Sequence, residues 1–103
     1  MAQNKSINNF DYSGRVVHVG PPAQYVTRNG QTKSFRILVM ETFIGEYSRE
    51  VVFEYNESNM SQLNQLIDGC WATITFCLSG NKTIRDGKGR WFPKLEGLTA
   101  IKG

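Results

Sequence analysis

The chain has 103 residues, with 12 Lys and Arg residues against 9 Asp and Glu residues and a formal net charge of +3. This length fits one domain with a single core, and a composition of 40% hydrophobic and 20% charged residues excludes wholesale disorder. No apolar run approaches the roughly 20 residues of a membrane span, and no apolar signal-peptide segment follows Lys5. We therefore expect a cytoplasmic protein without a membrane partner.

The small net charge hides an uneven distribution. Residues 1–40 carry +4, residues 41–69 carry −5 and residues 70–103 carry +4. Two basic segments thus flank an acidic one, which predicts a polarised surface rather than a uniformly basic one.

The first half of the chain has the pattern of strands. Residues 11–19 are rich in β-branched side chains and stop at Gly20-Pro21-Pro22, because proline cannot donate to a strand ladder. Residues 24–26 extend this strand or pair locally. Asn29-Gly30 predicts a type I′ hairpin or a loop tip. Residues 33–42 then predict a second strand that is apolar on both faces.

Residues 46–55 predict a third strand with two different faces. Even positions carry Glu46, Glu50 and Glu54, whereas odd positions end in Phe53 and Tyr55. The odd face is therefore the expected core face at its later end.

In residues 56–68 the spacing of the apolar residues changes to that of a helix. One side carries the apolar residues, Asn56 or Ser58 can cap the start, and Gly69 suits a left-handed helix end. The sequence therefore predicts one short amphipathic helix with an apolar side of Met60, Leu63, Leu66 and Ile67.

Two further strands and a glycine-rich loop complete the chain. Residues 71–78 predict a fourth strand, with Trp71 in the core or packed at the barrel end. Residues 79–89 predict a basic loop able to form a mobile hairpin, and residues 91–101 a fifth strand interrupted by Pro93 and Gly97. Because Trp91 and Phe92 are adjacent, we expect one in the core and the other, Trp91, exposed.

Three strands, a helix and two strands are the element order of a five-stranded Greek-key barrel, the OB fold. We therefore expect an all-β protein with a flexible N-terminus over residues 1–9 and a single OB-fold domain over residues 10–103. Its short helix falls between the third and fourth strands.

With this order in place, the chain resembles bacterial single-stranded-DNA-binding OB proteins. The resemblance rests on the glycine-bearing first strand at 14–20, on Asn29-Gly30, on the segment 63–69 and on the loop 85–91. The chain is also similar to a bacterial family of short OB proteins, through residues 52–55, 76–80 and 91–95. The likeness implies binding of single-stranded DNA in replication, repair or recombination. Residues 100–103 do not form the acidic tail with which such proteins recruit partners, so we do not extend recruitment to this chain.

Sequence-tolerant binding of a single strand needs a cationic groove for phosphates and exposed rings that stack on bases. OB domains place both on the second and third strands and on the loops that join strands one to two and four to five. Both loops are basic here and each has a ring nearby. The predicted nucleic-acid-binding residues are Arg28, Lys33, Arg36, Tyr47, Arg49, Lys82, Arg85, Lys88, Arg90 and Trp91.

The face that carries Glu46, Glu50 and Glu54 argues against this assignment, because carboxylates repel phosphates. If that face lines the groove, the prediction is weakened; if it turns outward, the glutamates keep the basic surface localised.

Other functions stay open from the sequence alone. The chain could be an OB-fold protein-interaction module that docks through Leu38, Met40 and the acidic strand, or an oligosaccharide-binding OB domain. RNA is a second candidate ligand, and we expect a homo-oligomer, either a dimer or a tetramer, because one small barrel offers a short binding path.

The sequence does not predict an enzyme, a cofactor or a metal site. It has no nucleophile motif and no phosphate-binding glycine loop that opens a helix. His18 is the only histidine, whereas zinc needs about four ligands. Cys70 and Cys77 are seven residues apart. If both lie on one strand, they face opposite sides and cannot pair, so we expect two reduced thiols.

Overall fold

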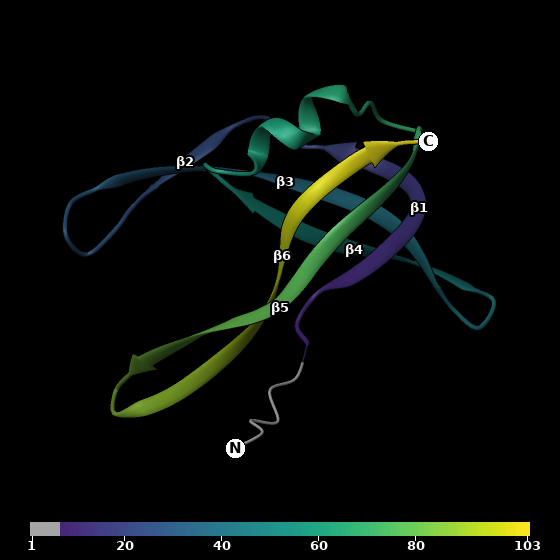
Figure 1. Cartoon of the computed structure of the whole chain (residues 1–103). Helices are drawn as coiled ribbons and strands as arrows, with labels where there is room; N and C mark the ends of the chain where they lie inside the picture. The colour runs from purple at the N-terminus through teal and green to yellow at the C-terminus, as the bar shows by residue number, and fades with distance from the viewer. Residues whose placement is uncertain (1–6) are drawn as a thin grey trace, which may run out of the picture.

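The computed structural model describes residues 7–103; the first six residues of the segment expected to be flexible lie outside this range. The elements are six strands and one short helix (Figure 1). In chain order they are β1 (Phe10–Val19), β2 (Ala23–Val26), β3 (Thr32–Ile44), β4 (Tyr47–Asn56), the 3-10 helix η1 (Met60–Gln65), β5 (Trp71–Arg85) and β6 (Lys88–Lys102).

Five of the strands close into a barrel. The sheet order is β1-β5-β6-β4-β3, and β1 also pairs with β3, which joins the two edges. The contact between β4 and β6 is parallel, at Glu54 and Glu96, while the other pairs are antiparallel. The short β2 adds to the outer end of β3. This is the predicted OB barrel, with its helix between the third and fourth barrel strands, β4 and β5.

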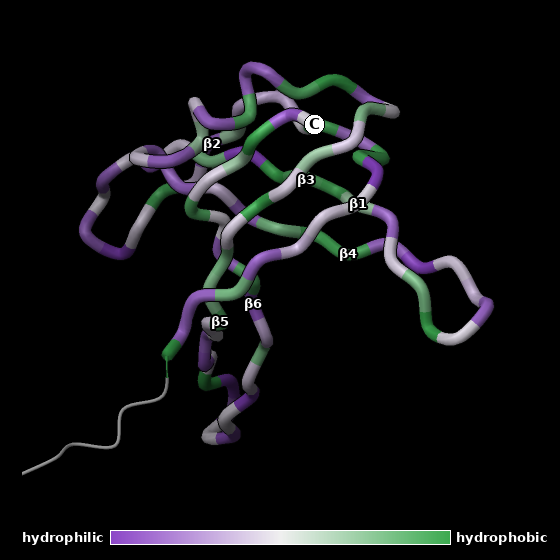
Figure 2. Tube along the Cα trace, turned by 45° about the vertical axis from the view of Figure 1, so that its right-hand side comes forward, coloured by the Kyte–Doolittle hydropathy of each residue, from purple (hydrophilic) through white to green (hydrophobic). Residues whose placement is uncertain are grey.

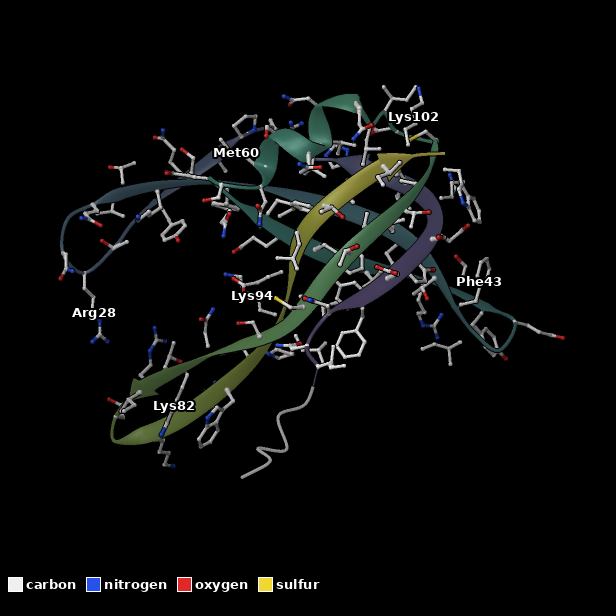
Figure 3. All side chains as sticks on the ribbon, in the orientation of Figure 1. Arg28, Phe43, Met60, Lys82, Lys94 and Lys102 are labelled. Atoms are coloured by element: carbon white, nitrogen blue, oxygen red, sulfur yellow. The ribbon has the colours of Figure 1, made fainter. Side chains whose placement is uncertain are left out.

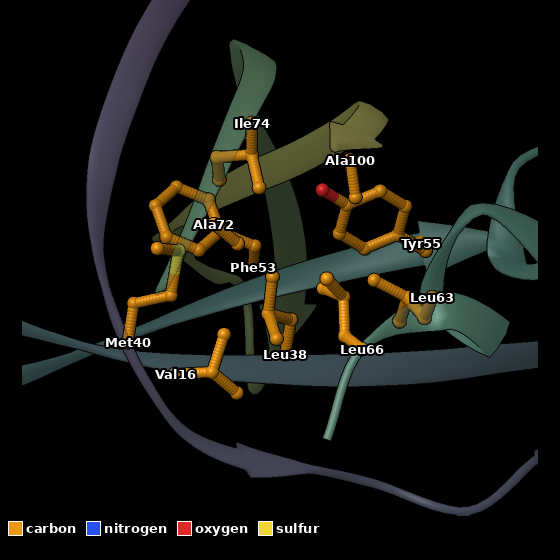
Figure 4. Packing of buried hydrophobic residues seen from close by; sticks show 10 residues of the cluster. All are labelled: Val16, Leu38, Met40, Phe53, Tyr55, Leu63, Leu66, Ala72, Ile74 and Ala100. Atoms are coloured by element: carbon orange, nitrogen blue, oxygen red, sulfur yellow. The ribbon is translucent and has the colours of Figure 1, made fainter. Parts of the chain in front are cut away.

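The core lies inside this barrel, between the strands and η1 (Figure 4). On β4 the odd positions Phe53 and Tyr55 are buried, as the alternation predicts. On β3 the even positions Leu38 and Met40 are completely buried, so they cannot form the docking surface considered from the sequence. Each such side chain contributes roughly 1.5–3 kcal/mol when fully buried. The remaining core residues are Val16, Leu63, Leu66, Ala72, Ile74 and Ala100.

Gly97 gives the largest core ring its space. A Cβ at this position would lie 2.1 Å from Cζ of Tyr55, and the Tyr55 hydroxyl donates to the Thr99 carbonyl oxygen at 2.8 Å. The glycine that appeared to interrupt the fifth strand is therefore a packing requirement, because only a residue without a side chain lets β6 pass over this ring.

The helix is shorter than the predicted segment 56–68. The Asn56 side-chain oxygen accepts hydrogen bonds from the backbone of Ser58 and Asn59, which forms a turn before the helix begins. Leu66 is extended at the other end, with φ −92° and ψ 147°. Leu63 and Leu66 enter the core, whereas Ile67 is exposed and does not belong to the apolar side as predicted.

Two sequence predictions about aromatic residues are corrected. Trp71 is 56% exposed rather than packed in the barrel, because it occupies the outward-facing position of β5 beside the buried Ala72. Trp91 is exposed as predicted, but its neighbour Phe92 is half-exposed as well. Both precede the point at which β6 joins the barrel, where no core lies beneath them.

The predicted loop 79–89 is a regular two-stranded arm. Strands β5 and β6 stay paired from Gly80 and Pro93 to Arg85 and Lys88. Asp86 and Gly87 both have positive φ, at 54° and 74°, which is the signature of a type I′ turn. We call residues 79–93, which include this turn, the β5–β6 arm.

The Asn29-Gly30 turn differs from its type I′ expectation. Gly30 has φ 78°, but Asn29 does not have positive φ, and the Gly30 amide donates to the Thr27 carbonyl oxygen at 3.0 Å. A turn followed by one left-handed glycine is the loop-tip alternative that the sequence left open. Hydrophilic residues gather in this β2–β3 hairpin, whereas hydrophobic residues recur along the barrel strands (Figure 2).

Candidate nucleic-acid interface

A groove crosses the outside of β3, β4 and β6, between the β2–β3 hairpin and the β5–β6 arm. It contains two hollows that share Glu54 and Lys94. The first, of about 410 Å³, is lined by Ile37, Val52, Glu54, Pro93, Lys94 and Leu95. The second, of about 390 Å³, is lined by Tyr25, Phe35, Glu54, Asn81 and Lys94.

The floor of the groove is apolar because of strand alternation. Leu38 and Met40 point inward on β3, so Phe35 and Ile37 point outward into the groove. On β4 the inward positions Phe53 and Tyr55 leave Val52 outside, where it is 49% exposed. The two apolar faces that the sequence shows for β3 are thus a core face and a groove face.

Glu54 and Lys94 form an ion pair in the middle of this floor. The Lys94 Nζ lies 2.5 Å from Oε2 of Glu54 and 3.5 Å from Oε1 of Glu96. Burial lowers the pKa of the Lys94 ammonium, but the two carboxylates outweigh it and hold this pKa above its ordinary value. Lys94 therefore stays charged and neutralises Glu54, the one member of the Glu46, Glu50 and Glu54 set that lines the groove.

The other two glutamates lie away from the groove. Glu50 lies opposite Glu41 of β3 in the strand register, and Glu46 lies in the turn between β3 and β4. At about 3.3 Å per residue, Glu46 is roughly 26 Å along the strand from Glu54. Most of the acidic face predicted from the sequence is therefore separated from the candidate interface.

The first rim of the groove is the β2–β3 hairpin. Tyr25 and Phe35 contact each other with ring centroids 5.7 Å apart, and Lys33 lies opposite Tyr25 in the strand register. The Glu57 carboxylate accepts a hydrogen bond from the Ser34 backbone at 2.6 Å, which holds β3 at this end. Arg28 extends from the hairpin tip on the side that also carries the β5–β6 arm (Figure 3).

The second rim is one face of the β5–β6 arm. Side chains alternate along a strand, so Lys88, Arg90 and Phe92 share the face of Lys94, which contacts Glu54 in the groove. Arg85 lies opposite Lys88 in the register and joins the same face. Arg85, Arg90 and Phe92 line a further hollow of about 340 Å³ with Thr83 and Ile84.

Lys82 and Trp91 occupy the other face of the arm. They are opposite each other in the register, and the Lys82 ammonium lies 4.8 Å from the Trp91 ring centroid. This contact is a cation–π pair on the surface. The sequence selected the exposed tryptophan, whereas the structure places Phe92, and not Trp91, on the side of the groove.

Three further predicted residues lie outside the groove. The Arg36 guanidinium donates to the Gly20 carbonyl oxygen and to Oδ1 of Asn64, both at 2.9 Å, because Arg36 shares its strand face with Leu38 and points toward η1. Tyr47 and Arg49 lie together near the β3–β4 turn, with the guanidinium 5.6 Å from the ring centroid. These three side chains therefore do not line the groove, and their role in nucleic-acid binding stays a prediction.

The structure adds residues that the sequence reasoning did not select. Phe35, Ile37, Val52, Glu54, Asn81, Phe92 and Lys94 all line the hollows. For the residues of β6, strand alternation indicates the grouping, because residues two apart share a face and Lys94 therefore lies on the face of Phe92 and Arg90. The prediction of a mobile basic hairpin over residues 79–89 did not include the strand register that puts Phe92 and Lys94 on one face.

Within residues 7–103 no cluster of three or more His, Cys, Asp or Glu side chains has the arrangement of a metal site. The thiols of Cys70 and Cys77 are free. None of the helices in the described part of the chain has the length and hydrophobicity to cross a membrane.

Comparison with solved structures identifies similar folds over nearly the whole chain. The SSB of Plasmodium falciparum in complex with ssDNA superposes with a TM-score of 0.56 at 15% identity, covering 98% of each chain. The mitochondrial single-stranded DNA binding protein Rim1 of S. cerevisiae gives 0.63 at 10% identity, covering 95% of this chain and 96% of that one. The small single-stranded DNA-binding protein of Streptomyces coelicolor gives 0.51 at 13% identity, covering 92% and 93%.

Neither a family model nor a curated protein sequence matches the chain. The likeness to solved structures therefore concerns the backbone. It agrees with the sequence resemblance, and it establishes that the chain has the OB fold found in these single-stranded-DNA-binding proteins.

Proposed function

We propose that this protein binds single-stranded DNA with little sequence preference, along the groove between the β2–β3 hairpin and the β5–β6 arm. The observation that carries the proposal is the layout of the groove, an apolar and aromatic floor between two cationic rims. The fold-level likeness to proteins described as binding single-stranded DNA supports it.

Each part of the groove suits one part of a single strand. Tyr25, Phe35 and Phe92 offer ring faces, and stacking on a ring contributes about 1–3 kcal/mol per base whatever the base. The cations of the rims, Arg28 and Lys33 on one side and Arg85, Lys88 and Arg90 on the other, suit the phosphates. The bases therefore face the floor, where Lys94 already neutralises Glu54.

The same chemistry serves RNA, which is the second candidate ligand. By this proposal the protein acts in DNA replication, repair or recombination, and its proposed location is the cytoplasm. The binding role requires no catalysis, so we propose a binding protein rather than an enzyme.

We also propose that the protein acts as a homo-oligomer, because one barrel offers only a short path to a strand. The β3–β4 hairpin supports this with three exposed apolar side chains near its turn, Phe43, Ile44 and Tyr47. Light scattering on the purified protein tests it, and a mass of 11.7 kDa, that of a single chain, would contradict it.

Titration of a fluorescently labelled oligothymidine at two salt concentrations tests DNA binding. We expect binding that weakens steeply with salt, because each neutralised phosphate releases counterions. The absence of binding at low salt would refute the proposal. An uncharged oligosaccharide of similar length serves as control, since its binding would not depend on salt.

A further inference from the structure

The second hollow of the groove combines a wall of rings with hydrogen-bonding groups. Tyr25 and Phe35 form its apolar side, and Glu54, Asn81 and Lys94 contribute a carboxylate, an amide and an ammonium group. Its volume of about 390 Å³ is the space of a small ligand pocket. A hollow with a ring wall and polar groups is suited to one unstacked base, which presents a face for stacking and an edge for hydrogen bonding.

The polar groups are held in a defined arrangement. Lys94 lies between Glu54 and Glu96, and all three side chains are partly buried, with 25% to 35% of their surface exposed. An ionised carboxylate has about four lone-pair sites and accepts hydrogen bonds without donating any. Glu54 can therefore keep Lys94 on Oε2 and still accept hydrogen bonds from a ligand, while the ammonium next to it can donate.

We propose that this hollow accepts one base of a bound strand and favours guanine, which Glu54 and Lys94 recognise together through its Watson–Crick edge. The inference rests on the proposed function and adds a preferred base at one position of an otherwise sequence-tolerant site. Glu54 is the specificity-determining residue, and Lys94 positions its carboxylate.

Guanine fits because its edge presents two adjacent donors, N1–H and the N2 amino group, next to the O6 acceptor. The two donors match the two oxygens of a carboxylate, and O6 then lies on the side of the ammonium. Thymine presents a single donor between two acceptors, and cytosine and adenine each present one amino group beside an acceptor. None of the three can fill both carboxylate oxygens through two adjacent donors.

Fluorescence anisotropy with three labelled probes of equal length tests this proposal. The first is an oligothymidine, the second carries one central guanine, and the third carries hypoxanthine there, which lacks the N2 amino group. We expect the guanine probe to bind roughly tenfold more tightly than the oligothymidine, with the hypoxanthine probe between them.

The Glu54→Gln variant identifies the residue responsible. We expect the ratio between the guanine and thymine probes to fall below about twofold, because an amide has only one acceptor oxygen. Absolute affinity for the oligothymidine rises, since a negative charge leaves the groove. Glu50→Gln is the matched control, because it removes the same charge from the same strand face outside the hollows. We expect this variant to keep the tenfold ratio between the affinities for the guanine probe and the oligothymidine.

Two results would overturn the inference: equal binding of all three probes by the unaltered protein, or a ratio that Glu54→Gln leaves unchanged. The hypoxanthine probe tests the contact on the unaltered protein, even if the variant folds poorly. Binding of oligothymidine without a guanine preference refutes this inference alone, whereas absence of binding to every probe refutes the proposed function as well.

Discussion

Strands β5 and β6 run through two regions of different character, the barrel and the arm. In the barrel, Ala72, Ile74 and Ala100 are buried in the core. In the arm, every residue from 79 to 93 is exposed although the strand pairing continues. Core packing therefore restricts which side chains the two strands can carry in the barrel, whereas it places no such restriction on the arm.

Exposure of a long hairpin leaves its side chains free for contacts with a ligand. The arm carries Arg85, Lys88, Arg90 and Phe92 on one face, and that face continues into Lys94 at the groove. The difference between the two regions implies that substitutions in the barrel change stability, whereas substitutions in the arm change binding and leave stability nearly unaltered.

Two glycines of β6 give the largest expected contrast. Gly97→Ala places a Cβ 2.1 Å from the buried Tyr55 ring, and we expect it to lower the free energy of unfolding by about 3 kcal/mol. A Cβ added by Gly89→Ala in the arm lies 2.8 Å from the flexible end of Lys82 and at ordinary contact distance, 3.5 Å, from the Trp91 ring. We therefore expect a change within about 0.5 kcal/mol. Urea denaturation measures both, and equal losses would remove the distinction between barrel and arm.

Phe92 and Trp91, which are adjacent on β6, test which face of the arm binds the strand. Phe92→Ala is expected to weaken oligothymidine binding about tenfold, because it removes a stacking surface on the groove side. Trp91→Ala removes a ring from the opposite face, and we expect less than about a threefold change. Both variants should melt like the unaltered protein. A larger loss for Trp91→Ala would show that the strand follows the other face of the arm.

The buried Tyr55 predicts how the barrel responds to high pH. Burial raises the pKa of its phenol above the ordinary value of about 10. Above pH 10 the unfolded chain therefore loses a proton that the folded chain keeps, and stability falls by up to about 1.4 kcal/mol per pH unit.

Denaturant titrations from pH 9 to pH 11 on the unaltered protein and on Tyr55→Phe measure this decline. The variant loses the hydrogen bond to Thr99, worth about 1 kcal/mol, but its stability should fall less steeply with pH. Parallel declines in the two proteins would contradict the assignment of the pH dependence to Tyr55.

Sequence patterns predicted the barrel well, because its physical determinants are local. The alternation in residues 46–55 identified Phe53 and Tyr55 as core residues, and Leu63 and Leu66 of the predicted apolar helix side enter the same core. Gly69 has the predicted positive φ of 91°, but the helix ends before it, at Gln65. The groove was harder to predict, since its hollows join residues of β2, β3, β4, β5 and β6. The contact between Lys94 and Glu54 depends on a strand pairing that no local pattern reveals.

The differences between sequence and structure at individual residues have the same physical origin. Arg36 lies between apolar residues, as a groove cation would, but its partners Gly20 and Asn64 are distant in sequence. Trp71 has the size of a core residue, yet the register with β1 and β6 turns it outward. A single sequence shows which residues share a strand face. The closure of the barrel decides whether that face packs in the core or lies on the outside.

The salt dependence of oligothymidine binding by the unaltered protein and by Arg85→Ala/Lys88→Ala/Arg90→Ala tests the central claim most directly. Each lost phosphate contact reduces the slope of log K against log salt by about 0.7, so the triple variant should have a slope shallower by about 2. Arg49→Ala, which removes a cation near the other hairpin, should leave the slope unchanged. An unchanged slope in a folded triple variant would contradict the claim that the β5–β6 arm binds the strand.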